Sequence, residues 1–140
     1  MKIKFEITTI PEKEQKKYLT AYLEGVLQIF IGSKLFFNQS GILLIEFAIV
    51  IRQWLTFFKK GRMIDFMYET MDYDEPILRI IHTNDNNFLI ESVWQEIEVK
   101  EQLQEADIVT EFEKYLENLS DALKLQLGVE LSDIIKENQE

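Results

Sequence analysis

Residues 41–60 read GILLIEFAIVIRQWLTFFKK and begin with the most apolar stretch of the chain, residues 41–51. From Leu44 onwards, the apolar side chains recur at the three- and four-residue spacing of one helix face. The members of this stripe are Leu44, Phe47, Ala48, Ile51, Leu55 and Phe58. The second face is apolar as well, so we expect a central helix covered on more than one side. Because the stretch contains Glu46 and ends at charged residues, it falls short of the roughly 20 apolar residues of a membrane-spanning helix.

Strands are predicted on both sides of this helix. Upstream, residues 2–9 alternate between apolar and polar side chains, and Gly32-Ser33 separates two runs of β-branched and aromatic residues, which indicates a hairpin. Residues 38–41 have turn chemistry and offer a cap for the central helix. Downstream, residues 63–99 are predicted to form an antiparallel meander. Its strands are expected at residues 63–70, 77–81 and 88–99.

A second long helix is predicted from Asp107, where the apolar period changes to 3.6, and Gly128 is its natural stop. Residues 131–136 add a short terminal helix. The predicted order is β-β-β-α-β-β-β-α, which favours an α+β fold. We therefore expect a single domain over residues 1–140, with two main helices packed on a largely antiparallel sheet of about six strands.

The composition excludes several classes of function. The chain has no Cys, one histidine (His82) without a GxSxG serine, and five glycines too dispersed for a phosphate-binding loop. Its net charge of −10 opposes binding to nucleic acids and anionic membranes. We expect no cofactor, no metal and a monomer. The N-terminus lacks the apolar run of a signal peptide, so a cytoplasmic location is expected.

The negative charge is concentrated in the second part of the chain. Residues 1–62 carry 10 basic and 5 acidic side chains (net +5), whereas residues 63–140 carry 5 basic and 20 acidic side chains (net −15). Such asymmetry either keeps the protein soluble or forms a surface complementary to a basic partner.

The densest acidic segment contains Asp72, Asp74 and Glu75. An EF-hand register that starts at Asp72 places Ile77 where glycine is needed and Thr83 where glutamate is needed, so that calcium motif fails. Three interpretations remain open: a solvated strand connection, a partner-facing acidic patch, and a site for a cation that prefers oxygen ligands.

Trp94, followed by Gln95 and Glu96, marks a second candidate region. A tryptophan in a predicted strand either packs in the core or anchors an interface, whereas Trp54 on the central helix is expected in the core. Glu96 and Glu98 share one face of that strand. The candidate partner-binding residues are Asp72, Asp74, Glu75, Trp94, Glu96 and Glu98.

Three short segments resemble a known family. They are residues 23–27 (LEGVL), 71–78 (MDYDEPIL) and 94–96 (WQE), in this order around the hydrophobic central helix. They are similar to small acidic proteins of Gram-positive bacteria that are linked to polymorphic-toxin loci as immunity proteins. That family includes the proteins that accompany wall-associated toxins whose C-terminal domain cleaves transfer RNA.

The resemblance covers most of the chain and implies a cytosolic protein that binds and neutralises a cognate toxin, with no catalytic residue to carry over. The acidic surface independently favours a basic target, such as the active-site cleft of a nuclease. Two alternatives stay open. One is a generic protein-interaction or scaffold module. The other is a small metal-dependent hydrolase that uses Asp72, Asp74, Glu75 and His82.

Overall fold

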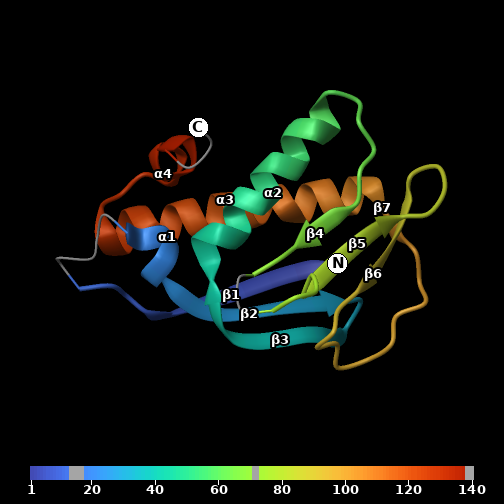
Figure 1. The fold of residues 1–140 in the computed structure, drawn as a ribbon, viewed down its shortest axis with the longest axis horizontal. Coiled ribbons are helices and arrows are strands. Elements are labelled where there is room, and N and C mark those ends of the chain that lie inside the picture. Colours follow the sequence, from blue (N-terminus) through green and yellow to red (C-terminus); the bar gives the residue numbers. More distant parts are fainter. Residues whose placement is uncertain (13–17, 71–72, 138–140) are drawn as a thin grey trace.

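The computed structural model describes residues 1–12, 18–70 and 73–137 (Figure 1). This described part has the α+β composition that the sequence predicts. In chain order its elements are β1 (Lys2–Thr9), α1 (Leu19–Tyr22), β2 (Glu24–Ile31), β3 (Lys34–Leu43), α2 (Leu44–Lys59), β4 (Phe66–Tyr68), β5 (Leu78–His82), β6 (Asn87–Glu91), β7 (Leu103–Gln104), α3 (Glu105–Leu127) and α4 (Leu131–Glu137).

The strands form two antiparallel sheets, and not the single sheet of about six strands that we expected. The first sheet has the order β1-β2-β3 and the second β4-β5-β6-β7. The long helix α2 follows β3 and carries the chain away before the second sheet begins (Figure 1). The segment after β6 returns to the first sheet, where the Glu96 N–H donates to the Phe36 carbonyl oxygen at 2.8 Å. It adds no strand there.

The central helix, the hairpin and the second long helix are confirmed. The hairpin turns at Gly32-Ser33, where Ile31 pairs with Lys34. Trp54 on α2 is buried, as predicted for a core residue. Gly128 adopts the left-handed conformation (φ 67°) at the C-cap of α3, a conformation that glycine adopts without steric cost.

The predicted turn at residues 38–41 is wrong. These residues stay in β3, which continues to Leu43. Gly41, in the left-handed conformation (φ 69°), lies where the pairing of β2 with β3 shifts register, so the strand absorbs the glycine as an irregularity. No side-chain cap hydrogen bond begins α2. Instead the Leu44 N–H donates to the Leu23 carbonyl oxygen at 3.4 Å.

Two predicted strands of the meander are shorter in the structure. The strand expected at residues 63–70 is reduced to β4, because residues 63–65 form no ladder. The strand expected at residues 88–99 ends with β6 at Glu91, and residues 92–102 are irregular up to the two-residue strand β7. Trp94, Glu96 and Glu98 therefore lie on a connection and not on a strand.

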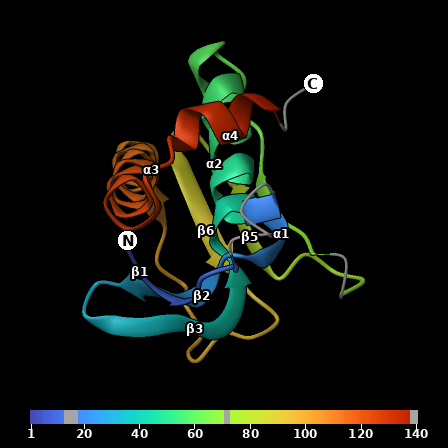
Figure 2. The same cartoon turned by 90° about the vertical axis from the view of Figure 1, so that its left-hand side faces the viewer.

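The core lies between the helices and the inner faces of both sheets. Figure 2 views α3 end-on, with α2 beside it and the first sheet below. The Phe47 ring on α2 is central, with centroid distances of 6.0 Å to Phe66, 4.9 Å to Tyr68 and 5.1 Å to Tyr115. The buried Tyr115 hydroxyl donates to the Leu44 carbonyl oxygen at 2.7 Å and ties α3 to the start of α2. No helix in the described ranges has the length and apolar character needed to span a membrane.

Candidate functional site

The structure brings together the two regions that the sequence singles out. The centroids of the Tyr73 and Trp94 rings lie 5.4 Å apart, and the ring planes differ by 67°. This is the edge-to-face arrangement that pairs of aromatic side chains prefer. Tyr73 precedes β5 and Trp94 follows β6, and these two strands pair directly, with Arg79 opposite Glu91. The pairing of the two strands therefore places the connections at their ends side by side.

The segment before β5 and the segment after β6 meet at a place that we call the junction, and Ser92 connects them there. Its hydroxyl donates to the Ile77 carbonyl oxygen and accepts from the Trp94 N–H at 3.0 Å. The Ser92 N–H in turn donates to the Gln95 side-chain oxygen at 3.2 Å. These bonds fold the chain into a tight turn at the end of β6, and this turn directs Trp94 towards Tyr73.

The acidic candidates differ in how near they lie to the aromatic pair along the chain. Asp74, Glu75 and Glu96 are exposed; Asp74 and Glu75 follow Tyr73 in the chain, and Glu96 lies two residues after Trp94. We call these three residues, together with Tyr73 and Trp94, the Tyr73–Trp94 surface. Glu98 is exposed farther along the connection and is not among the described residues that line the cavities on either side of this surface. Asp72 lies outside the described residues.

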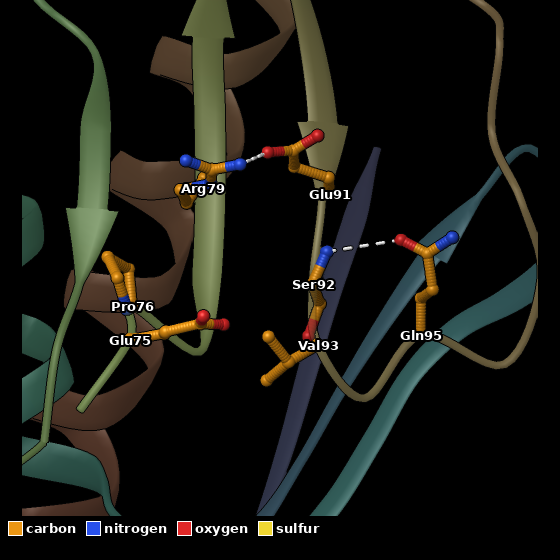
Figure 3. A pocket seen from close by; sticks show the side chains of 7 residues that line it. All are labelled: Glu75, Pro76, Arg79, Glu91, Ser92, Val93 and Gln95. Atoms are coloured by element: carbon orange, nitrogen blue, oxygen red, sulfur yellow. Dashed lines mark hydrogen bonds and ion pairs between the residues drawn. The ribbon is translucent and has the colours of Figure 1, made fainter. Parts of the chain in front are cut away.

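A cavity of about 610 Å³ lies on one side of the junction (Figure 3). Its lining residues are Glu75, Pro76, Arg79, Glu91, Ser92, Val93 and Gln95. We call it the Arg79 cavity. Arg79 on β5 forms an ion pair with Glu91 on β6 along its wall, and Glu75 and Val93 extend towards one another below that pair (Figure 3). The guanidinium charge in this cavity is therefore balanced by a neighbouring carboxylate.

A second cavity, of about 370 Å³, lies on the other side, where β3 passes into α2. Its lining residues are Gln39, Ser40, Gly41, Ile42, Leu43, Glu46, Tyr68, Thr70, Tyr73, Ile77 and Trp94. We call it the Trp94 cavity. Both rings of the aromatic pair line it, and Glu46 is the only Asp or Glu among its described lining residues.

The three segments that carry the family resemblance meet around the Trp94 cavity. Tyr73 and Ile77 belong to one segment and Trp94 to another, and all three line the cavity. The remaining segment, residues 23–27, adjoins the cavity, because Gly25 pairs with the lining residue Ile42. Segments that are far apart in the sequence therefore meet at one cavity in the fold.

Tyr68, at the cavity, is buried, and its environment disfavours the phenolate. Burial first, and then the nearby Glu46 carboxylate, raise the pKa of Tyr68 well above its usual value. Burial likewise raises the pKa of Tyr115, with Tyr68 as the second cause. Both hydroxyls therefore remain protonated across the physiological pH range.

Tyr68→Phe is expected to flatten the loss of stability at alkaline pH. In the unfolded chain a tyrosine ionises near pH 10, while native Tyr68 keeps its proton, so native stability is complete below pH 10 and falls as pH rises towards the native pKa. Each such tyrosine contributes a slope of up to about 1.4 kcal/mol per pH unit. Urea unfolding between about pH 8 and 11 measures it. Equal slopes in the unmodified protein and the variant would contradict the assignment.

Three residues of this site were not selected from the sequence. Ser92 gave no signal, because its role depends on hydrogen bonds that form only in the fold. Tyr73 lies in the acidic segment, where the pattern of charges does not distinguish it from its neighbours. Glu46 carried a signal: a lone acidic residue within the most apolar stretch of the chain.

His82 has a structural explanation. It is half-buried at the end of β5, its Nε2 lies 2.6 Å from the Asp85 carbonyl oxygen, and its ring lies 5.2 Å from that of Phe88. Its backbone N–H donates to an Asp65 side-chain oxygen at 2.8 Å. Across the described ranges, no group of three or more His, Cys, Asp or Glu residues is placed to hold a metal ion.

Residues 1–125 identify the family of the chain. No curated protein and no solved structure matches the chain significantly. A family model described as a domain of unknown function (DUF7878) matches residues 1–125, which include the Tyr73–Trp94 surface and both cavities. The chain therefore belongs to the DUF7878 family.

Proposed function

We propose that this protein is an immunity protein that binds and neutralises a cognate nuclease toxin domain in the cytoplasm, without catalysing a reaction. The observation that carries the proposal is the Tyr73–Trp94 surface, where an aromatic pair is flanked by exposed carboxylates. The resemblance of residues 23–27, 71–78 and 94–96 to immunity proteins of polymorphic-toxin loci supports the same function.

The chemistry of the surface suits a basic protein. A nuclease must attract phosphates, so its substrate cleft carries Lys and Arg, and carboxylates of an inhibitor can occupy the positions of those phosphates. Aromatic residues supply the large buried contacts that dominate binding energy at the centre of an interface. Tyr73 is 43 % exposed and Trp94 is half-buried, so both have area left for a partner to cover.

The proposal includes specific commitments on partners. The toxin domain is the partner, with no direct binding of nucleic acid or membrane and no cofactor. The immunity protein acts as a monomer, which leaves the Tyr73–Trp94 surface free for the toxin. The acidic balance of residues 63–140 supports this choice of partner, because it repels nucleic acids and attracts basic proteins.

Binding of the toxin domain encoded immediately upstream tests the proposal, and Tyr73→Ala is expected to weaken that binding about thirtyfold, a loss typical of an interface hot spot. Tyr22→Ala is a matched control. Tyr22 is 44 % exposed against 43 % for Tyr73, and it also forms an edge-to-face pair, with Tyr18. Titration calorimetry should show that the control binds as the unmodified protein does.

Two outcomes would contradict the proposal. The first is the absence of a complex at micromolar concentration with the neighbouring toxin domain. The second is a homodimer in solution that buries Tyr73, Asp74 and Glu75 in its own interface, because that arrangement identifies an interaction or scaffold module. Analytical ultracentrifugation at several concentrations, with Tyr73→Ala as a probe of the contact, distinguishes such a dimer from a monomer.

A further inference from the structure

The helices α2, α3 and α4 border a cavity of about 340 Å³ that shares no lining residue with the Arg79 cavity or the Trp94 cavity. In Figure 2, α4 crosses α2, and α3 lies beside them. The buried side chains of Leu131 and Ile135 and the half-buried side chain of Leu116 give this cavity an apolar wall. Its other lining residues are Arg52, Glu117, Ser120, Ser132 and Lys136. We call it the helix cavity. Its volume lies within the range of small-molecule sites, about 300–1,000 Å³.

A smaller cavity, of about 200 Å³, lies along the last turns of α2. Its lining residues are Arg52, Leu55, Thr56, Lys59 and Lys60. We call it the Lys59 cavity. Because Arg52 lines this cavity as well as the helix cavity, the two cavities adjoin at its side chain. Arg52, Lys59 and Lys60 are exposed, and no Asp or Glu is among the described residues that line the Lys59 cavity. The apolar wall of one cavity therefore lies beside the cations of the other.

These two cavities have the opposite charge to the two cavities of the candidate site. Their described lining residues include four Lys or Arg side chains and a single carboxylate, that of Glu117. In the Arg79 cavity one cation is outnumbered by two carboxylates, and the described lining of the Trp94 cavity has a carboxylate and no Lys or Arg. No ion pair between described residues involves Arg52, Lys59 or Lys60. In a chain of net charge −10, this group of cations forms a local positive field that attracts an anion.

The lysines at the end of α2 also have a structural role, since cations stabilise the negative end of a helix dipole. Capping of the last carbonyl groups does not require them. The backbone N–H of Lys60 donates to the Phe57 carbonyl oxygen at 3.1 Å. The backbone N–H of Gly61 donates to the Phe58 carbonyl oxygen at 3.0 Å. The dipole opposes an anion at this end with the effect of about half an elementary charge, whereas three cationic side chains line the Lys59 cavity. The balance favours an anion.

We propose that the helix cavity and the Lys59 cavity together bind a small amphiphile, a carboxylate or phosphate head group on an apolar chain of about eight carbon atoms. Arg52, Lys59 and Lys60 bind the head group, and Arg52 offers it two parallel N–H donors. The chain packs against the apolar wall of the helix cavity, whose volume equals the share of about eleven water molecules in the liquid. The inference does not depend on the proposed function, because it uses neither the toxin domain nor the Tyr73–Trp94 surface.

Two probes test the paired cavities: n-octanoate and n-octyl phosphate. Titration calorimetry of the full chain, at constant ionic strength and below the micellar concentration of each probe, measures binding. We expect at least one of them to bind saturably with a submillimolar dissociation constant, and the tighter of the two identifies the head group. Counterparts that lack the negative charge (n-octanol, n-octylammonium) or the chain (acetate, inorganic phosphate) are expected to bind about tenfold more weakly or less. Shortening the chain of the tighter probe by two methylene groups is expected to weaken binding about tenfold.

Two variants test the two halves of the site separately. Lys59→Gln combined with Lys60→Gln is expected to weaken binding of the probe about tenfold or more, because two partners of the head group are lost. Its control is Lys34→Gln combined with Lys100→Gln, the same change of net charge at exposed residues outside both cavities.

Ser132→Leu places an apolar side chain at an exposed position on α4 that lines the helix cavity, and it is expected to weaken binding about tenfold by occupying the space of the chain. Gln126→Leu, the corresponding addition at an exposed residue of α3 outside the cavity, is its control. Exposed positions tolerate such substitutions, so we expect all four variants to fold.

Each of four outcomes would overturn the proposal. The first is no saturable binding of either probe. The second is binding of n-octanol as tight as that of the tighter probe, because the cations then play no part. The third is binding of acetate or inorganic phosphate as tight as that of the probe with the same head group, because the apolar wall then plays no part. The fourth is that either cavity variant binds as its control does. No arm uses the toxin domain, so these results and the test of the immunity function are independent of each other.

Discussion

Replacing Gly25 with alanine is expected to destabilise the protein by about 3 kcal/mol or more, at the upper end of the cost of overpacking. A Cβ at this position would lie 2.2 Å from the Glu6 carbonyl oxygen and 2.6 Å from Leu44 Cδ1. The first contact is with the backbone of β1, which pairs with β2 at Ile7–Gly25, so a side-chain rotation cannot relieve it. The strands themselves must separate, or the β1–β2 pairing must shift.

Gly32→Ala is the control for this prediction. Gly32 lies at the tip of the hairpin with φ 62°, and a Cβ there would meet no atom within 4 Å. Its cost is that of the left-handed conformation alone, about 1–2 kcal/mol. Urea unfolding of both variants separates the steric cost from the conformational one. If Gly25→Ala lowers the free energy of unfolding by no more than Gly32→Ala does, the prediction of a steric clash between β1 and a side chain at position 25 is wrong.

The same substitution links the fold to the candidate site. Gly25 pairs with Ile42, which lines the Trp94 cavity, and its close neighbour Leu44 is the first residue of α2. A shift of β2 would therefore displace both the wall of the cavity and the helix that carries Glu46. The close approach of β1 therefore explains why a glycine stands near the start of β2, in the segment that adjoins the cavity.

The sequence predicts secondary structure most accurately where a periodic pattern is compatible with only one type of element. Residues 44–59 are apolar at helical spacing, and α2 forms there. The connection after β6 shows the opposite case. Ile97 and Val99 pack partly against the core while Glu96 and Glu98 are exposed, so burial alternates as in a strand although no ladder forms. Alternation reports which side chains are buried, and it does not report whether the backbone pairs.

The candidate site was predicted as separate pieces. The dense acidic segment indicated Asp74 and Glu75, and the ability of a tryptophan to anchor an interface beside polar residues indicated Trp94 and Glu96. Their assembly depends on the Ser92 hydroxyl, which bonds to Ile77, fifteen residues away in the chain. The approach of Glu46 depends on how α2 follows β3. Contacts of this range arise from the tertiary fold, and no local pattern encodes them.

Neutralising three carboxylates of the Tyr73–Trp94 surface is expected to slow association with the toxin domain about tenfold or more at low ionic strength, because electrostatic steering raises association rates by about 10- to 1,000-fold. The variant is Asp74→Asn, Glu75→Gln and Glu96→Gln combined. Exposed carboxylates contribute little to stability, so the fold should be retained. Stopped-flow association over a salt series measures the effect.

A second triple variant separates the local surface from the overall charge. Its members are Glu113→Gln, Glu117→Gln and Asp121→Asn, all exposed on α3, and they change the net charge by the same amount. If steering acts at the Tyr73–Trp94 surface, this variant should associate nearly as fast as the unmodified protein. Equal slowing in both triple variants would mean that only the net charge of the protein matters.

The salt dependence itself decides whether the acidic half of the chain acts on a partner at all. The Debye length shrinks from about 30 Å at 0.01 M salt to about 8 Å at 0.15 M, so a steered association slows steeply over this range. Dissociation should change far less, because short-range packing around Tyr73 and Trp94 sets it. In the Asp74, Glu75 and Glu96 variant the salt dependence of association should flatten. An association rate of the unmodified protein that ignores salt would show that the net charge of −15 over residues 63–140 serves solubility alone, and electrostatic complementarity to a basic toxin would have to be abandoned.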